Sequence, residues 1–137
     1  MTRIPDALRR QVIERANGCC EYCLLHQDDN SFSHEIDHIT AEKHYGETVL
    51  NNLSLSCLDC NRHKGSDLTS IDLQTGEVVR LFHPRLDNWD EHFRLDGAHI
   101  TPLTAKGRVT VNLLKMNSAE QVAKRTELIE LGRYPRT

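Results

Sequence analysis

The spacing of apolar residues predicts a helix near the start of the chain. Apolar side chains recur three to four positions apart from Leu8 to Ala16, with Pro5 before them and Gly18 after them. Proline is favoured at the first turn of a helix and glycine just past its last turn. The pattern therefore indicates an amphipathic helix between Pro5 and Gly18.

Two short strands and a second helix are expected in the middle of the chain. Residues 34–39 form a run compatible with a strand, and in 51–57 Leu53 and Leu55 alternate with polar residues. Alternation of this kind is typical of a strand with one buried face. Residues 58–64 follow as a helix that Gly65 would end.

The second half of the chain has weaker patterns. The elements expected there are a β-hairpin over 70–82 that turns at 74–76, a strand near 98–101, and helices over 104–116 and 118–131. Ser118 is a good N-cap for the last helix. The polar, aromatic-bearing segment 83–93 shows no clear period and is left unassigned.

Length and composition describe one small domain with a thin core. The chain has 137 residues, of which 38% are apolar and only 5% aromatic. This length suits a single domain over 1–137, and a bound metal would help to stabilise it. An apolar stretch of about 20 residues, as needed to span a bilayer, is not found, so a soluble, cytoplasmic protein is expected.

Charge is unevenly distributed along the chain. The net charge of −3 argues against a nucleic-acid partner. Residues 27–60 nevertheless carry seven acidic and one basic side chain, whereas 101–137 carry seven basic and three acidic. A protein that holds both a cation and a polyanion could have this distribution, and so could an ordinary soluble protein.

Four of the five cysteines form two C-x-x-C pairs. They are Cys20 with Cys23 and Cys57 with Cys60. A two-residue spacer lets both sulfurs of a pair lie on one side of a turn, so two pairs can complete a tetrahedral zinc site. Disulfides or plain buried thiols are the alternatives, and Cys19 offers another partner for Cys23. A site with four thiolates has no open position, which makes the zinc structural.

The zinc pairs would clamp the ends of a 33-residue insert, residues 24–56. In a helix that begins near Cys57, the two cysteines share one side, and Asn61 and Lys64 share a side rotated by about 100° from it. One helix would thus present a zinc-binding side and a polar side to the insert. Any catalytic chemistry must come from that neighbourhood.

The combined pattern resembles a known family. CEYC, EIDHI, NNLSLSC, LDC and NRHKG, in this order, are similar to the zinc-containing branch of the HNH endonucleases, which have a ββα-metal core. The core resemblance runs from about Cys20 to Lys64, within an expected core of about 19–66. The later pieces TGE, LFHPR, WDEHF and LTAKGRVTV are also similar to segments of bacterial HNH proteins. The fold class implied is α+β, with an N-terminal helix, a β-hairpin extension and C-terminal helices around the core.

The resemblance implies a metal-dependent hydrolysis of DNA phosphodiester bonds. His38 corresponds to the general base, a task suited to imidazole, which titrates near neutral pH. Asp37 and Asn61 correspond to the ligands of one catalytic Mg or Mn ion, for which hard oxygen donors are appropriate. Asn52 corresponds to a brace that orients the base, although Asn51 is adjacent.

Several other residues receive weaker roles. Lys64, Arg62 and His63 are candidate phosphate contacts. His44 and His83 are left between a substrate-side role and a structural one. Trp89 and Phe93 lie four positions apart, which favours packing in the core or an interface over base stacking.

Two other readings compete with the nuclease. A catalytically inactive zinc module that binds nucleic acid or protein would keep the scaffold, but it should have lost at least one of Asp37, His38 and Asn61. A redox switch built on the C-x-x-C pairs would leave EIDHI and Asn61 unexplained. The sequence leaves open whether the substrate is DNA or RNA and whether one strand or both are cut, because these depend on the groove outside the core. A single site cuts one strand, so duplex cleavage would need a homodimer or two events.

Overall fold

The N-terminal helix forms where its pattern predicts. In the computed structural model, which describes residues 3–136, helix α1 spans Asp6–Arg15 with Pro5 as its N-cap. Gly18 lies just beyond it with a φ of +72°, a conformation that favours glycine. Val12 is fully buried against Leu53 and Leu55, so α1 covers one face of the hairpin described next.

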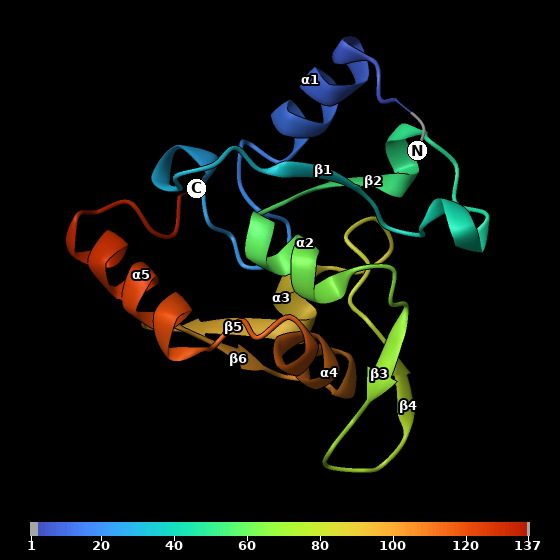
Figure 1. Cartoon of the computed structure of the whole chain (residues 1–137). Helices are drawn as coiled ribbons and strands as arrows, with labels where there is room; N and C mark the ends of the chain where they lie inside the picture. The colour runs from blue at the N-terminus through green and yellow to red at the C-terminus, as the bar shows by residue number, and fades with distance from the viewer. Residues whose placement is uncertain (1–2, 137) are drawn as a thin grey trace.

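A two-stranded hairpin and a helix form the centre of the molecule (Figure 1). Strand β1 (Glu35–His38) pairs antiparallel with β2 (Leu53–Ser56), which places Asp37 opposite Ser54 and His38 opposite Leu53. Helix α2 (Leu58–Lys64) follows β2 after one residue and ends before Gly65, at a φ of +53°. The predicted strand–strand–helix order is therefore present.

Both faces of β2 are buried. Leu53 and Leu55 pack toward α1, and Ser54 and Ser56 on the opposite face are also 0% exposed. The cysteine-bearing loop, which holds Cys20 and Cys23 after α1, runs beside this strand, and its Glu21 amide donates to the Leu55 carbonyl at 2.8 Å. The alternation in residues 51–57 predicted a strand with one buried face, whereas β2 is buried on both faces.

The remaining elements build the lower part of the molecule in Figure 1. They are β3 (Thr69–Ile71), β4 (Val78–Arg80), α3 (Trp89–His92), β5 (Phe93–Asp96), β6 (His99–Pro102), α4 (Ala105–Leu113) and α5 (Ala119–Glu130), with 3₁₀ turns at Gln27–Asp29, Glu42–His44 and Leu50–Asn52. The hairpin, the strand near 98–101 and both C-terminal helices match the prediction, and Ser118 caps α5 by accepting from the amide of Gln121. The short helix α3 lies in the segment 83–93 that was left unassigned. Strand β5 begins at the last residue of that segment and was not predicted; it pairs antiparallel with β6.

One buried cluster links the cysteine-bearing loop to these later elements. It joins the four C-x-x-C cysteines to Phe82, Phe93, Ile100 and Leu114. Phe93 stacks at a tilt on Trp89 with ring centroids 5.0 Å apart, so this pair belongs to the core. Within residues 3–136, no helix is both long and apolar enough to cross a bilayer.

The β3–β4 hairpin is attached to α4 through one carboxylate. Asp72, 1% exposed, accepts hydrogen bonds from Arg108 Nε at 3.1 Å and Nη2 at 2.9 Å. It also accepts from the amide of Gln74 and the hydroxyl of Thr75 in the turn. These hydrogen bonds lower the pKa of Asp72 to about 2, and the hydrogen bond from Arg108 is the largest cause.

The lowered pKa predicts acid-sensitive anchoring of this hairpin. A carboxyl whose pKa is depressed in the folded state contributes stability that is present above its ordinary value near 4 and is lost as pH falls toward about 2. Asp72→Asn should therefore lower the urea midpoint at pH 7 and flatten its decline between pH 4 and 2. The exposed Asp96 offers a matched control, Asp96→Asn, and equal pH profiles for both variants would contradict the assignment.

Candidate functional site

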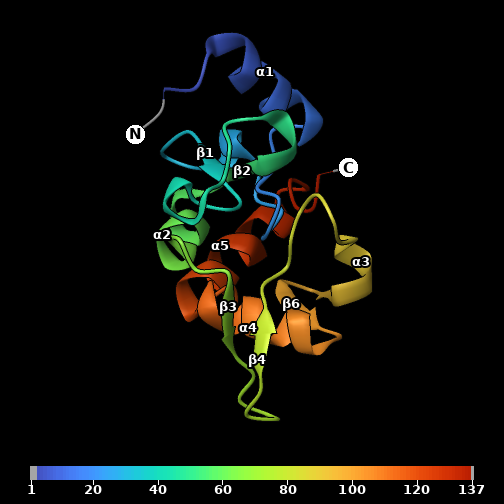
Figure 2. The ribbon, with the colours of Figure 1, turned by 90° about the vertical axis from the view of Figure 1, so that its right-hand side faces the viewer.

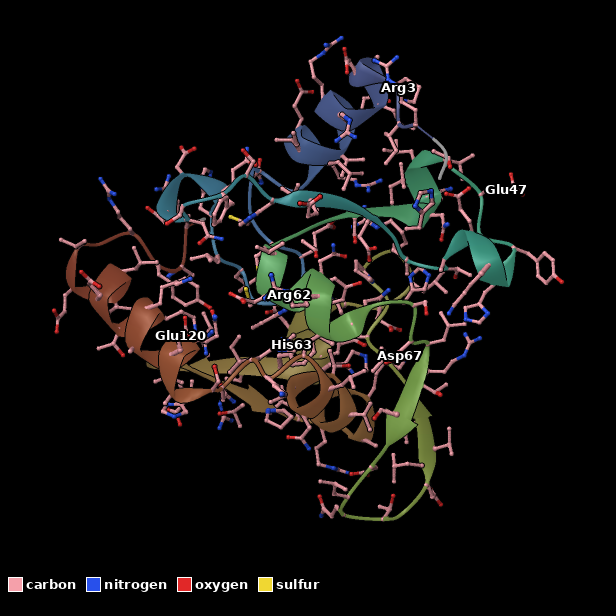
Figure 3. All side chains as sticks on the ribbon, viewed as in Figure 1. Arg3, Glu47, Arg62, His63, Asp67 and Glu120 are labelled. Atoms are coloured by element: carbon pink, nitrogen blue, oxygen red, sulfur yellow. The ribbon has the colours of Figure 1, made fainter. Side chains whose placement is uncertain are left out.

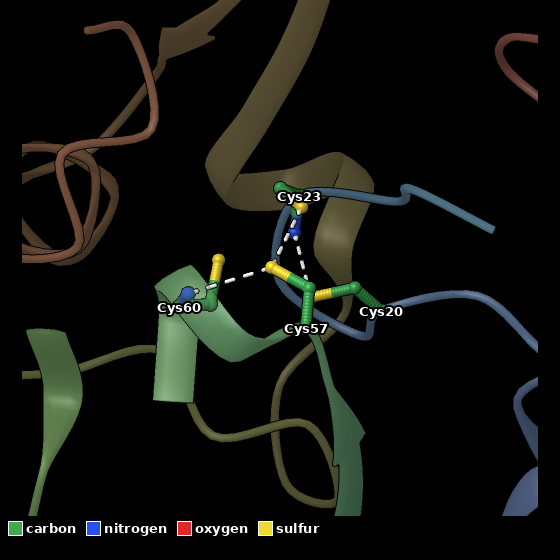
Figure 4. Close-up of side chains that lie close together, drawn as sticks. All are labelled: Cys20, Cys23, Cys57 and Cys60. Atoms are coloured by element: carbon green, nitrogen blue, oxygen red, sulfur yellow. Dashed lines mark hydrogen bonds between the residues drawn. The ribbon is translucent and has the colours of Figure 1, made fainter. Parts of the chain in front are cut away.

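The four C-x-x-C sulfurs meet at one point between the N-terminal loop and the start of α2 (Figure 4). All four ligand atoms of Cys20, Cys23, Cys57 and Cys60 lie within 4.8 Å of one another, and all four residues are buried. The sulfurs of Cys23 and Cys57 are 3.7 Å apart. A tetrahedral zinc with Zn–S distances of about 2.3 Å places its sulfurs about 3.8 Å apart, so the cluster is compatible with structural zinc.

Backbone amides already point at two of these sulfurs. The amide of Cys23 donates to Cys20 Sγ at 3.5 Å, and that of Cys60 donates to Cys57 Sγ at 3.4 Å. Such amide donors stabilise negative charge on thiolates. The Tyr134 hydroxyl donates to the Cys23 carbonyl at 2.8 Å, which ties the C-terminal segment to the same loop.

The chemistry of the cluster calls for a cation. Hydrogen bonds to the neighbouring thiols and burial raise the pKa of the Cys60 thiol well above its ordinary value. Four thiolates so close together would repel one another without a positive ion between them. Cys19 is half-buried and is not in the cluster.

Asp37 lies against α2. Its Oδ2 is 3.4 Å from Lys64 Nζ, and the same ammonium donates to the Ile39 carbonyl at 3.1 Å. The Lys64 side chain is only 3% exposed and that of Asp37 16%. Burial raises the pKa of the Asp37 carboxyl, and the charge of Lys64 offsets part of that rise. Lys64 thus joins the end of β1 to the last turn of α2.

His38 makes its hydrogen bond to the loop that follows β1. Its Nε2 is 2.9 Å from Thr48 Oγ1 and 4.0 Å from Glu42 Oε1. Adjacent strand residues point to opposite faces, so His38 and Asp37 leave β1 on different sides at its very end. The hydrogen-bond partner of the His38 ring within residues 3–136 is thus Thr48, through Nε2.

Asn52 closes the loop that carries Thr48. Its Oδ1 accepts from the Thr40 amide at 2.9 Å, and its Nδ2 donates to the carbonyls of Thr40 at 3.0 Å and Glu47 at 2.8 Å. Gly46 lies inside this closure, because a Cβ there would be 1.7 Å from the Thr40 carbonyl oxygen. Asn51 is exposed. The observed contacts fit a bracing role for Asn52.

The polar residues of α2 are placed less uniformly. Asn61 and Lys64 are one turn apart and so share a side of the helix, and Lys64 on that side reaches Asp37. Figure 3 labels Arg62 and His63 on α2. Arg62 is exposed, whereas His63 Nδ1 is buried and has no hydrogen-bond partner within residues 3–136. The phosphate-contact roles of these residues stay predictions.

Two residues of the loop were missed by sequence reasoning. Thr48 holds the histidine ring and Gly46 permits the tight closure. A lone threonine in a polar loop carries no sequence signal for such a contact. The glycine was visible, but its necessity arises only from the approach of Thr40.

Comparison with known proteins supports the class. Residues 20–67 match the model of the HNH endonuclease family, and this range contains the cysteine cluster, both strands and α2. The chain therefore carries an HNH endonuclease domain of mixed α/β structure, as the resemblance implied.

A curated relative is the Septu protein PtuB of Bacillus thuringiensis. It is 25% identical over 117 residues, which cover 84% of this chain and 43% of that protein. The chain thus spans less than half the length of this relative. No solved structure matches the chain significantly.

Loss of one clustered sulfur should cost the protein its metal and most of its stability. Apparent binding free energies of structural zinc are on the order of 10–16 kcal/mol in small peptides, comparable to the whole stability of a domain. We expect Cys57→Ser to lose stoichiometric zinc and to melt without a cooperative transition. The matched control is Cys19→Ser, which should keep one zinc per chain and the parental melting temperature. Elemental analysis and thermal unfolding measure both. A stable Cys57→Ser protein that unfolds cooperatively would show that zinc is not what stabilises the fold, and wild-type protein without zinc would exclude the zinc site.

Proposed function

We propose that this protein is a metal-dependent endonuclease that hydrolyses DNA phosphodiester bonds at the open end of the β1–β2 hairpin. The observation that carries the proposal is the pairing of a held imidazole with a carboxylate at the end of β1. His38 is bound to Thr48, and Asp37 is bound to Lys64 of α2. The HNH family match over residues 20–67 supports the same reaction class.

His38 acts as the general base in this proposal. Because Thr48 engages Nε2, the proton of an attacking water is taken by Nδ1. Thr48 and the Asn52 closure set the direction of the ring, and the Glu42 carboxylate lies 4.0 Å from Nε2. A phosphate lying across the end of β1 would meet His38 on one side and Asp37 on the other.

The residues present fit one hard divalent cation. Asp37 offers a carboxylate and Asn61 an amide oxygen, and so few protein ligands leave room for water and phosphate oxygens. When bound, Mg or Mn would act as a Lewis acid that stabilises charge on the phosphate and the departing oxygen. Lys64 then serves to orient Asp37 and to offset its charge, rather than to project into solvent.

The wider expectations follow from the same site. Residues 1–137 would work as one nuclease domain, because a single buried cluster joins the cysteines to the C-terminal elements. A single site cuts one strand, so nicking is the expected product and a homodimer would be needed for concerted duplex cleavage. A cytoplasmic setting would keep the five free thiols reduced and able to bind metal.

Removal of the base should abolish cleavage without loss of structure. We expect wild-type protein with Mg or Mn to nick supercoiled plasmid, and His38→Ala to slow nicking by about 10²- to 10⁴-fold, the usual contribution of a general base. His99→Ala on β6 changes an exposed histidine and should leave the rate unchanged. An inactive zinc module would show no cleavage in either protein, and full activity of His38→Ala would refute the assignment of the base.

The loop closure gives a second, independent test. Asn52→Ala removes three hydrogen bonds, and Gly46→Ala forces a Cβ onto the Thr40 carbonyl. Both should lower kcat by about tenfold or more, because misorientation of a catalytic group is costly, while zinc content stays at one per chain. Asn51→Ala, at the neighbouring exposed position, should match wild type. Equal losses in the Asn51 and Asn52 variants would mean that the brace was placed at the wrong residue.

A further inference from the structure

A cavity of about 300 Å³ lies beside the proposed nuclease site. One side is formed by the HNH core, through Ile39, Thr40, His44 and Lys64, and the other by β4 and the segment after it. Figure 2 turns toward the viewer the side of the molecule on which β3 and β4 lie below α2. Its volume is at the lower end of the range for small-ligand pockets.

The walls of the cavity combine apolar surface with cations. Leu68, Leu81 and Phe82 provide apolar lining, and Leu86 at the surface is 75% exposed. Lys106 is paired with Asp87 at 3.0 Å. The exposed charged or titratable groups of the lining are then Arg80 and His44, which lie on opposite sides of the cavity, and the carboxylate of Asp67. This arrangement suits a ligand with a flat apolar part and an anionic part.

His83 adds a donor with a defined orientation. Its Nδ1 accepts from the amides of Arg85 at 3.1 Å and Leu86 at 3.2 Å. A nitrogen that accepts two amide protons carries no proton of its own, so the ring proton resides on Nε2. Burial lowers the pKa of His83, and the charges of Arg80 and Lys106 lower it further. His83 is therefore a neutral hydrogen-bond donor in the wall of the cavity.

The cavity shares a wall with the proposed catalytic residues. Lys64 lines it and touches Asp37 at 3.4 Å, and Ile39 and Thr40 directly follow His38 in the chain. A strand whose scissile phosphate lies at the end of β1 would place an adjacent nucleotide at the mouth of this cavity. A paired, stacked base cannot enter such a pocket, whereas an unstacked one can.

We propose that this cavity binds one unstacked nucleotide of the substrate strand, next to the scissile phosphate, with the base against Leu68, Leu81 and Leu86 and the phosphate toward Arg80 and His44. The inference rests on the proposed nuclease function, because the nucleotide that enters the cavity belongs to the DNA strand that the nuclease cuts. It makes single-stranded or locally unpaired DNA the preferred substrate, because unstacking costs least there.

Binding is tested without cleavage in full-length, zinc-loaded His38→Ala protein. The probes are dAMP, deoxyadenosine, inorganic phosphate and a short single-stranded oligonucleotide, and the readout is the NMR shift of the methyl groups of Ile39, Leu68, Leu81 and Leu86. We expect dAMP to shift these methyls, deoxyadenosine and phosphate to do so at least about tenfold more weakly, and the oligonucleotide to displace dAMP. Arg80→Gln should weaken dAMP binding about tenfold, and Arg94→Gln on β5, also exposed, should not.

The outcomes separate this inference from the nuclease itself. Equal shifts with inorganic phosphate alone would reduce the cavity to a bare anion site and overturn the proposal. Binding of dAMP that the oligonucleotide does not displace would make it a site for free nucleotides and also overturn it. Nucleotide and strand binding in a protein that never cleaves DNA would support the cavity while refuting the nuclease.

Cleavage adds a second readout in the wild-type background. We expect faster cutting of single-stranded than of fully paired oligonucleotides of the same sequence, and faster cutting of a duplex with one unpaired nucleotide beside the cut. Arg80→Gln should reduce this preference about tenfold, whereas Arg94→Gln should retain it. Active protein with no such preference, and no effect of Arg80→Gln, would overturn the cavity proposal and leave the nuclease intact.

Discussion

The four-sulfur cluster is the contact on which the rest of the molecule depends. It joins the loop after α1 to the first turn of α2 and so brings together the two ends of a 33-residue insert. With aromatic residues at only 5% of the chain, apolar burial alone gives a thin core, and a metal at this position would supply what that core lacks. Phe82, Phe93 and Tyr134 of the later elements pack on or bond to the same cluster, so the clamp also positions the second half.

Within the insert, the loop between β1 and β2 is closed by hydrogen bonds. Asn52 satisfies backbone groups of Thr40 and Glu47, and Gly46 lets the chain approach closely enough for this. The closed loop then presents Thr48 to His38. On the other side of β1, the buried Lys64–Asp37 contact sets the carboxylate against α2. A buried charge pair contributes little net stability, and here it fixes the Asp37 carboxylate against α2.

The downstream half of the chain adds a wall to this site as well as stability. The segment after β4 and helix α4 face the HNH core across the cavity, and both sides contribute cations to it. Part of the basic excess of the last 37 residues makes contacts within the fold. Arg108 bonds to Asp72, and Arg125 donates to backbone carbonyls.

The sequence by itself determined the features that depend on local spacing. Helical periodicity predicted α1, and the two C-x-x-C pairs predicted the cluster, because the signal in each case lies within short runs of the chain. EIDHI and NRHKG indicated the HNH domain through their resemblance to that family. Tertiary structure alone decided the contacts between distant segments. Lys64, expected to meet phosphate, lies buried on Asp37, Thr48 holds the His38 ring, and β5 exists only through its pairing with β6. Such contacts depend on how segments far apart in the chain pack together, and a pattern of neighbouring residues does not predict that packing.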